Sequence, residues 1–367
     1  MTAEQTMSRF FSSRYSELVP YVPGEQPADL ASFVKLNTNE SPFPPSAAAL
    51  LYAKENARAA NLYCDPDANE LCAVFAKTVG VDPDEVLPGN GSDELLNFAF
   101  MAFCGGDKPA LFADITYGFY TVFAALNGIE QVRIPLADDF SLNVYDYIER
   151  PGTVFIANPN APTGIALAPS EIEKIVAAKP DDVIVVDEAY VDFGAESCIP
   201  LIKEYDNLLV IQTFSKSRSM AGARLGFAVG DRALINDLKT LKYSTNPYNV
   251  NSYTQALGIG TLLDGDYTKN CCGDIIAVRE FTVDALKKLG FELTDSKANF
   301  VFARHPGYSG AELYKKLAER KILVRHFGAE RIKDYLRISI GSRAQMEKLT
   351  EALTDILAEE TIAGGAE

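Results

Sequence analysis

The feature that most constrains the fold is a regular alternation of short apolar runs and helical patterns between about residues 85 and 240. Apolar runs at 110–115, 153–157 and 208–212 have the length and composition of buried strands. Helical patterns at 93–103 and 170–178 alternate with them. This alternation predicts an α/β fold with a mostly parallel sheet flanked by helices, in which polar side chains gather at the carboxyl ends of the strands.

The pattern changes after about residue 243, which indicates a second domain. Short apolar runs alternate with helical patterns over residues 299–358. The chain of 367 residues is also too long for one compact core. We therefore expect a large domain at 36–270 and a smaller α+β domain made of 271–367 and of 1–35, which begins as an N-terminal arm.

Charge and composition narrow the class of function. The net charge of -16 argues against nucleic acid as a general partner. No apolar run approaches the roughly 20 residues needed to span a bilayer, and the N-terminal segment lacks the apolar core of a secretory signal. The six cysteines contain no C-x-x-C pair, and the two histidines are His305 and His326. We therefore expect a cytoplasmic protein with neither a metal site nor a Ser-His-Asp triad.

Lys216 follows the apolar run at 208–212, in a loop rich in hydroxyls and small residues. Thr213, Ser215 and Arg224 lie close to it in sequence, and a guanidinium can hold a phosphate through two hydrogen bonds. A lysine whose pKa is lowered beside a bound cofactor is suited to forming a Schiff base. The alternative is a solvated surface lysine, which is the usual state of this residue.

A second anion site is indicated by Gly91-Ser92-Asp93, which opens the helix predicted at 93–103. Glycine lets the backbone approach an anion closely, and a helix N-terminus offers unpaired N–H groups. An ordinary helix cap is the alternative interpretation. The segment is not G-x-G-x-x-G, so a dinucleotide site is not supported.

Three further strand ends carry residues with specific chemistry. Asp187 follows an apolar run at 183–186, where a carboxylate needs a cation or hydrogen-bond donors, although a helix cap is the alternative. Tyr117 follows the run at 110–115 and either stacks on a flat heterocycle or packs in the core. Asn158 opens the turn N-P-N-A-P-T-G, where its amide can donate to an oxygen acceptor.

Together these motifs resemble the fold type I pyridoxal-phosphate aminotransferases. The resemblance is carried by Ser215-Lys216 with Arg224, by the N-P-x-x-P-T-G turn, and by D-E-x-Y at 187–190. The segment K-L-N-T-N-E-S-P at 35–42 is similar to the entry segment of the histidinol-phosphate aminotransferase branch. The similarity extends over about residues 20–355, and it implies the large and small domains of that fold.

The resemblance implies pyridoxal 5'-phosphate as the cofactor, held by Lys216 as a Schiff base. Asp187 would keep the ring nitrogen protonated, Tyr190 and Asn158 would hold the ring oxygen, and Tyr117 would stack on the ring. The residues implied around the phosphate are Gly91, Ser92, Asp93, Thr213, Ser215 and Arg224, with Tyr63 supplied by the second subunit of a homodimer. Cys64 stands where the family has proline beside this tyrosine.

The implied reaction is amino transfer between L-histidinol phosphate and 2-oxoglutarate, giving imidazole-acetol phosphate and L-glutamate in histidine biosynthesis. Tyr21, Asn39, Arg325 and Arg337 would bind the substrates. Two other enzymes remain open, a broad-specificity aromatic amino acid aminotransferase and a threonine-phosphate decarboxylase. From another class, a ligand-sensing module of a transcription regulator also remains open.

Overall fold

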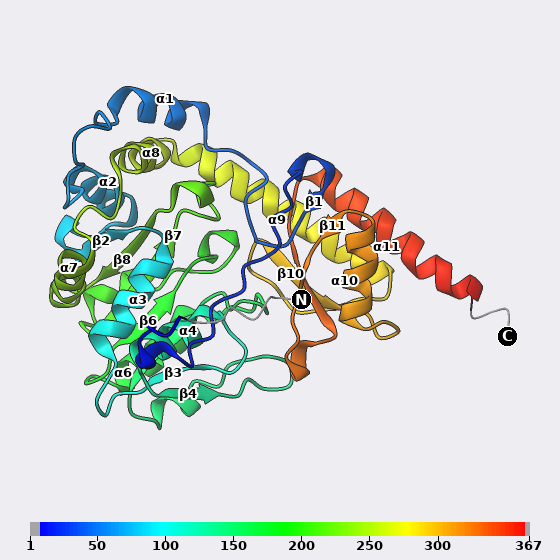
Figure 1. Ribbon diagram of the computed structural model, residues 1–367, viewed down its shortest axis with the longest axis horizontal. Coiled ribbons are helices and arrows are strands. Elements are labelled where there is room, and N and C mark those ends of the chain that lie inside the picture. The colour runs from blue at the N-terminus through cyan, green and yellow to red at the C-terminus, as the bar shows by residue number, and fades with distance from the viewer. Residues whose placement is uncertain (1–7, 364–367) are drawn as a thin grey trace.

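A seven-stranded sheet forms the centre of the larger lobe in the computed structural model, which describes residues 8–363 (Figure 1). Its strands lie in the order β2 (Val86–Gly89), β8 (Gly226–Gly230), β7 (Leu208–Thr213), β6 (Ile184–Asp187), β5 (Thr153–Ala157), β3 (Ala110–Ala113) and β4 (Gln131–Ile134). The predicted mostly parallel sheet is confirmed. The exception is β8, which returns antiparallel to β7 because no crossover helix separates the two strands.

Helices cover both faces of this sheet, and the strands alternate their side chains between the two faces. Val154 and Ile156 pack into one core cluster, and Phe155 and Ala157 pack into the other. On the first face lie α2 (Asn69–Val79), α6 (Pro169–Ala178) and α8 (Ser252–Leu263), with α1 (Ala47–Asn56) against α8. On the second face lie α3 (Ser92–Phe103), α4 (Phe119–Asn127) and α7 (Arg232–Thr245). The short helix α5 (Tyr145–Ile148) contacts α6 on the first face. Burial on both faces explains why the strands are continuously apolar.

The smaller lobe is built on an antiparallel sheet. Its strands lie in the order β12 (Arg325–His326), β13 (Tyr335–Ser339), β10 (Phe300–Arg304) and β9 (Glu292–Leu293), and α10 (Gly310–Glu319) and α11 (Arg343–Ala363) pack against them. The long helix α9 (Gly265–Lys288) runs from one lobe to the other (Figure 1). The predicted domain boundary at residue 270 falls inside α9, and the division at 36–270 stays a prediction.

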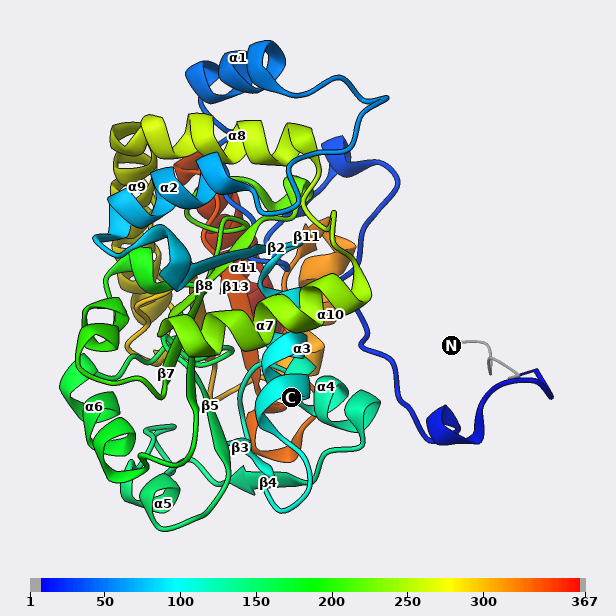
Figure 2. The same cartoon turned by 90° about the vertical axis from the view of Figure 1, so that its left-hand side faces the viewer.

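A segment near the N-terminus crosses between the lobes. Strand β1 (Val34–Lys35) pairs in parallel with β11 (Ile322–Leu323) of the smaller lobe, and Leu36 N–H donates to Leu323 O at 2.7 Å. Before β1, residues 21–25 contact the body of the protein, and the described part of the arm that precedes them extends outward (Figure 2). After β1, the chain passes into the space between the lobes, where residues 37–40 reach the candidate site. Within residues 8–363, no helix is both long and apolar enough to cross a membrane.

Candidate active site

A cavity of about 180 Å³ lies where β5, β6 and β7 end and α3 begins. Strand ends of a doubly covered α/β sheet are the usual place for a ligand site, because the loops there diverge while the sheet stays rigid. The cavity brings together residues that are up to 186 positions apart in the chain, Thr38 and Arg224. Among the residues predicted from the sequence, it is lined by Ser92, Asp93, Tyr117, Asp187, Tyr190, Thr213, Ser215, Lys216 and Arg224.

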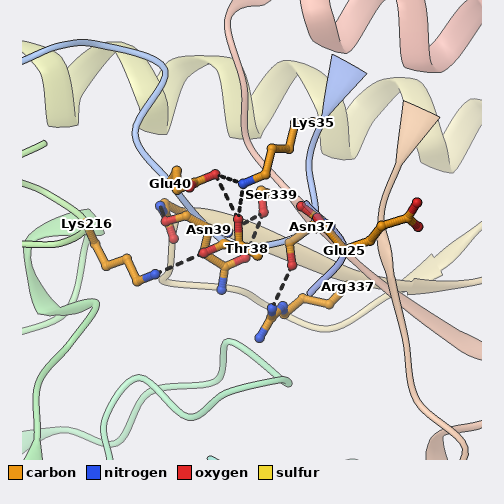
Figure 3. A network of polar contacts seen from close by, with 10 residues as sticks. Glu25, Lys35, Asn37, Thr38, Asn39, Glu40, Lys216, Arg337 and Ser339 are labelled. Carbon is orange, nitrogen blue, oxygen red and sulfur yellow. Dashed lines mark hydrogen bonds and ion pairs between the residues drawn. The ribbon is translucent and has the colours of Figure 1, made fainter. Parts of the chain in front are cut away.

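Lys216 lies on the loop that follows β7, and its ammonium group points into the cavity. Its Nζ donates to the carbonyl oxygen of Thr38 at 3.0 Å, a contact that Figure 3 shows. Burial, and secondly the nearby Arg337 charge, lower the pKa of Lys216 to about 8. Close to neutral pH this amine therefore loses its proton far more easily than an exposed lysine, as a nucleophilic or proton-transferring lysine must.

Asp187 ends β6 at the floor of the cavity and is 4% exposed. Burial raises the pKa of its carboxyl group to about 7, while hydrogen bonds from Tyr120 and the Ala189 N–H oppose that rise. The Tyr120 hydroxyl donates to Oδ2 at 3.0 Å and the Ala189 N–H to Oδ1 at 3.2 Å. Within the described part of the chain, no basic side chain forms an ion pair with Asp187, so a cationic ligand atom fits here.

Tyr120 was not found from the sequence. It lies three residues after Tyr117, in the first turn of α4, and the two ring centroids are 5.7 Å apart. Nothing local indicates that its hydroxyl meets a carboxylate 67 residues away, because the side chain is otherwise buried among aromatic core residues.

An anion cradle faces Lys216 at the start of α3. Ser92 and Asp93 begin the helix, where backbone N–H groups are free of helical partners. Gly91 has φ +82, and a Cβ there would lie 2.4 Å from Arg224 Nη2, so glycine is required for the close approach of the guanidinium. On the opposite side Ser215 Oγ accepts from Arg224 Nη1 at 3.3 Å and from Thr213 Oγ1 at 3.0 Å.

The acidic side chain of the cradle is already paired. Asp93 Oδ2 accepts from Arg224 Nη2 at 3.1 Å, and its Oδ1 accepts from the Tyr117 hydroxyl at 2.7 Å. The carboxylate therefore orients the arginine and the aromatic ring, and the backbone N–H of Asp93 is the part suited to an anion. Tyr117 lines the cavity, as a ring that stacks on a flat ligand must.

Asn158 lies beside Asp187, since its N–H donates to the Asp187 carbonyl oxygen at 2.9 Å, but its side chain turns away from the main cavity. Its Nδ2 donates to Leu167 O at 3.0 Å and its Oδ1 accepts from Leu167 N at 2.8 Å, so both ends of the amide are used within its own turn. The side chain lies at a neighbouring cavity, and Ala161 lines the main cavity instead. The role of the Asn158 amide as a donor to the cofactor stays a prediction.

Residues 37–40 form one wall of the site, and Figure 3 shows their polar contacts. Asn39 is 1% exposed, and its amide is engaged at both ends, by the Tyr190 hydroxyl and by Ser339. The role of Asn39 in binding substrate stays a prediction. Glu40 lines the cavity, where burial is outweighed by hydrogen bonds from Lys35 and Thr38 that lower the pKa of its carboxyl group.

Two arginines of the smaller lobe project together beside this wall. Arg325 and Arg337 are direct partners in the antiparallel pair of β12 and β13, so their side chains leave the sheet on the same face. Arg337 Nη2 donates to Asn37 O at 3.1 Å, and its buried Nε–H finds no partner among the described residues. Arg325 donates to the carbonyl oxygens of Val22 at 3.1 Å and Pro23 at 3.4 Å. Two neighbouring cations, one of them with an unused donor, favour a bound anion.

Tyr21 and Tyr63 lie outside the cavity. Tyr21 stacks on Phe119 with ring centroids 4.3 Å apart, and it contributes to the electrostatic surroundings of Arg337. Tyr63 is 74% exposed and stacks on Tyr248 at 4.3 Å. Beside it Cys64 is buried, with its thiol donating to Val250 O at 3.1 Å. The role of Tyr63 in a neighbouring subunit stays a prediction.

The combination of groups fits one kind of cofactor. A lysine of lowered pKa, a buried carboxylate without a cation, an aromatic ring and an anion cradle surround the same cavity. A flat heterocycle with a protonated ring nitrogen, a carbonyl carbon and a phosphate meets each of these groups with its chemical complement. Pyridoxal phosphate has all of these features.

The fold and this site define a fold type I enzyme that depends on pyridoxal phosphate. The family described as aminotransferase class I and II matches residues 31–353, and the chain belongs to that family. Pyridoxal phosphate is the cofactor of this family, so the predicted cofactor and enzyme class are confirmed.

Close relatives carry a more specific name. The chain is 48% identical to "Histidinol-phosphate aminotransferase 2" of Dechloromonas aromatica, over 95% of this chain and 99% of the relative. It is 49% identical to the protein of the same name from Rhizobium meliloti, over 96% and 100% of the two chains. The solved histidinol-phosphate aminotransferase of Sinorhizobium meliloti in complex with pyridoxal-5'-phosphate superimposes with a TM-score of 0.85 at 23% identity, covering 96% and 99%, and supports the fold.

Proposed function

We propose that this aminotransferase moves the amino group between L-histidinol phosphate and 2-oxoglutarate, giving imidazole-acetol phosphate and L-glutamate. Relatives with nearly half their residues identical over almost the whole chain bear the corresponding name. The observation that carries the proposal in the structure is the pairing of Arg325 with Arg337 across β12 and β13. Two guanidiniums on one face match the double negative charge of a phosphate monoester better than a single carboxylate.

The arginine pair also accounts for two substrates in one site. Histidinol phosphate carries a phosphate and lacks a carboxylate, whereas glutamate carries carboxylates. Arg337, with an unused Nε–H, has a donor for either anion, and Arg325 adds the second charge that the phosphate requires. One aromatic ring assists both arginines, because the centroid of the Phe327 ring lies 5.9 Å from the Arg325 guanidinium carbon and 5.7 Å from that of Arg337.

The cofactor would be held by the cavity residues. Gly91, Ser92, Thr213, Ser215 and Arg224 would bind its phosphate, Tyr117 would stack on its ring, and Asp187 would hold the proton on its ring nitrogen. When bound, pyridoxal phosphate supplies an electron sink for the electron pair left by the departing proton of the substrate carbon. The raised pKa of Asp187 supports this role, because a carboxyl group buried without a cation gains most from a cationic partner.

Lys216 would both bind the cofactor and move the proton. With a pKa of about 8, its amine exists in both protonation states near neutral pH, which suits a group that first accepts and then returns a proton. The Thr38 carbonyl, 3.0 Å from Nζ, would orient the amine between these events. Tyr190 would donate its hydroxyl proton to the ring oxygen of the cofactor.

A homodimer with shared active sites would complete this arrangement. Tyr63, which is 74% exposed, would reach the cofactor phosphate of the partner subunit. Further exposed apolar side chains, Leu50, Leu51, Leu62, Tyr248, Tyr253 and Leu263, supply surface that association would cover. All six cysteines are free, which agrees with a cytoplasmic enzyme. Sedimentation of the purified protein tests the assembly.

The visible absorption spectrum of the cofactor-loaded protein tests the reaction. Histidinol phosphate added without any oxo acid should convert the enzyme once and remove the visible band, and 2-oxoglutarate should restore it. Conversion by phenylalanine but not by histidinol phosphate would favour an aromatic amino acid aminotransferase. Release of carbon dioxide from threonine phosphate would favour the decarboxylase.

Arg325→Gln tests the observation that carries the proposal. It should raise the KM for histidinol phosphate by about 10- to 100-fold, the loss expected for a charge-assisted contact, and change the KM for glutamate less. Arg304→Gln is a matched control, since Arg304 lies in the same sheet but pairs with Glu292 at 2.7 Å. Equal effects of Arg325→Gln on both substrates would contradict the assignment.

A further inference from the structure

The Tyr190 hydroxyl accepts a hydrogen bond from the Asn39 amide, and the chemical nature of the two groups determines which of them is the donor. Asn39 Nδ2 lies 3.0 Å from the Tyr190 hydroxyl oxygen, and both residues are buried. An amide NH₂ group donates and does not accept, so the phenol must accept in this contact. The single proton of the phenol is then free for another acceptor. Since Tyr190 lines the cavity, that proton is directed to whatever the cavity binds.

The orientation of the Asn39 amide follows from Ser339 (Figure 3). Ser339 Oγ accepts from the Asn39 N–H at 2.8 Å and donates to Asn39 Oδ1 at 2.8 Å. Because serine has one hydroxyl proton, and Asn39 Oδ1 takes it, the amide oxygen faces Ser339 and the NH₂ group faces Tyr190. Turning the amide round would leave this buried hydroxyl proton without its acceptor.

The backbone holds Asn39 in this position as well. Its φ of +56 lies in the left-handed region, which asparagine adopts more readily than most residues. Its carbonyl oxygen accepts from Asn299 Nδ2 at 2.9 Å. Ser339 and Asn299 belong to the smaller lobe and Tyr190 to the larger one, so hydrogen bonds of Asn39 join the two lobes.

The Asn158 amide, which the sequence also suggested as a donor, faces its own turn. Asn158 is bonded at both amide ends to Leu167, and Ala161 lines the cavity with a methyl group. Burial raises the pKa of Tyr190, an effect that the Arg337 charge and the Asn39 bond oppose, while Asp187 and Tyr21 reinforce it. The phenol therefore keeps its proton and acts as a donor.

We propose that Asn39, locked by Ser339, is a positioning residue that directs the hydroxyl proton of Tyr190 onto the ring oxygen of the bound cofactor. This inference rests on the proposed function, since it takes pyridoxal phosphate as the occupant of the cavity. It assigns Asn39 a role through Tyr190 in place of contact with substrate.

Asn39→Asp is the decisive variant, because it keeps the size of the side chain and its tolerance of the left-handed backbone. The carboxylate cannot donate, so Tyr190 donates to it and the cavity loses the donor. We expect the dissociation constant for pyridoxal phosphate, measured by adding the cofactor to the cofactor-free protein, to rise about tenfold, as for loss of one hydrogen bond of about 1.4 kcal/mol. The visible spectrum of the loaded protein at one fixed pH should also change.

The Tyr190→Phe background shows whether Asn39 acts through the phenol. Without the hydroxyl, Asn39→Asp should change the dissociation constant less than about twofold, because directly coupled residues are not additive. Asn37→Asp is the matched control: it adds the same charge two positions away, with its amide bonded to Glu25 O rather than to Tyr190. Asn37→Asp should change the dissociation constant for pyridoxal phosphate equally in the original protein and in the Tyr190→Phe background.

An Asn39→Asp effect of equal size in both backgrounds, or no effect in either, would overturn the proposal. Should Asn39→Asp not fold, Ser339→Ala provides the second test, because it frees the amide to turn and should weaken cofactor binding only while Tyr190 is present. Since these measurements use no substrate, they are independent of which amine the enzyme accepts. Failure of the unmodified protein to bind the cofactor would instead refute the proposed function.

Discussion

Asp187→Asn is expected to stabilise the cofactor-free protein increasingly as the pH rises. Burial raises the pKa of Asp187 to about 7, from 3.8 as its ordinary value. An acid whose pKa is raised in the folded state favours its protonated form there, so the folded protein loses stability as the pH rises from about 4 to about 7. Because asparagine does not ionise, the variant does not lose stability in this way as the pH rises.

The size of the effect follows from the same shift. A rise of about three pKa units corresponds to about 4 kcal/mol of unfolding free energy once the pH exceeds the folded pKa. Between pH 5 and 8 the free energy of unfolding of Asp187→Asn should therefore increase by about 3 kcal/mol relative to the original protein. Any loss of hydrogen bonding from the Ala189 N–H is an offset that does not depend on pH.

Urea unfolding of both cofactor-free proteins at pH 5 and pH 8 measures this difference directly. Glu188, whose pKa burial also raises to about 7, is present in both proteins, so its contribution cancels. If the difference in unfolding free energy between the two proteins stays constant with pH, the reasoning is refuted. If that difference falls with rising pH, Asp187 already has a cationic partner. Saturating pyridoxal phosphate should stabilise the original protein more than the variant.

Three further predictions test the site. Lys216→Ala should abolish turnover and the visible absorption of the cofactor complex, and substantial turnover would exclude this lysine as the catalytic amine. Tyr120→Phe should fold normally, since the ring packs in an aromatic core, but bind the cofactor about tenfold more weakly, measured by titration. Gly91→Ala should weaken cofactor binding because the added Cβ would collide with Arg224. Gly80→Ala is the control, since Gly80 has φ +76 but no atom near its Cβ position: it should lower the melting temperature and leave cofactor binding unchanged.

Much of the fold was predictable because its signals are local. The buried strand at 153–157 and the helix starting with Ser92-Asp93 follow from apolar periodicity and helix-start residues that lie within one short window. The polar motifs were predicted to share one site for a general reason. Parallel strands present their carboxyl ends at the same edge, so Asp187 and Lys216 meet without any direct sequence relation.

Other features were missed because the sequence holds no local trace of them. The antiparallel direction of β8 depends on a connection too short for a crossover, which the apolar pattern of Gly226–Gly230 does not show. Asn158 belongs to a family motif, yet both ends of its amide are hydrogen-bonded to the backbone of Leu167, nine residues later. A motif gives the identity of a side chain, but its hydrogen-bond partners depend on how the turn packs.

The sequence by itself determined the layered α/β architecture, the cofactor class and the lysine, carboxylate and anion-binding groups, since each rests on residue type and short spacing. Only the tertiary structure decided which other side chains orient these functional groups. Tyr120 reaches Asp187 across 67 residues, Asn39 reaches Tyr190 across 151, and Ser339 holds Asn39 across 300. These bonds depend on the packing of two lobes around one cavity, and hydrogen bonds between distant residues form only where that packing brings donor and acceptor within about 3 Å.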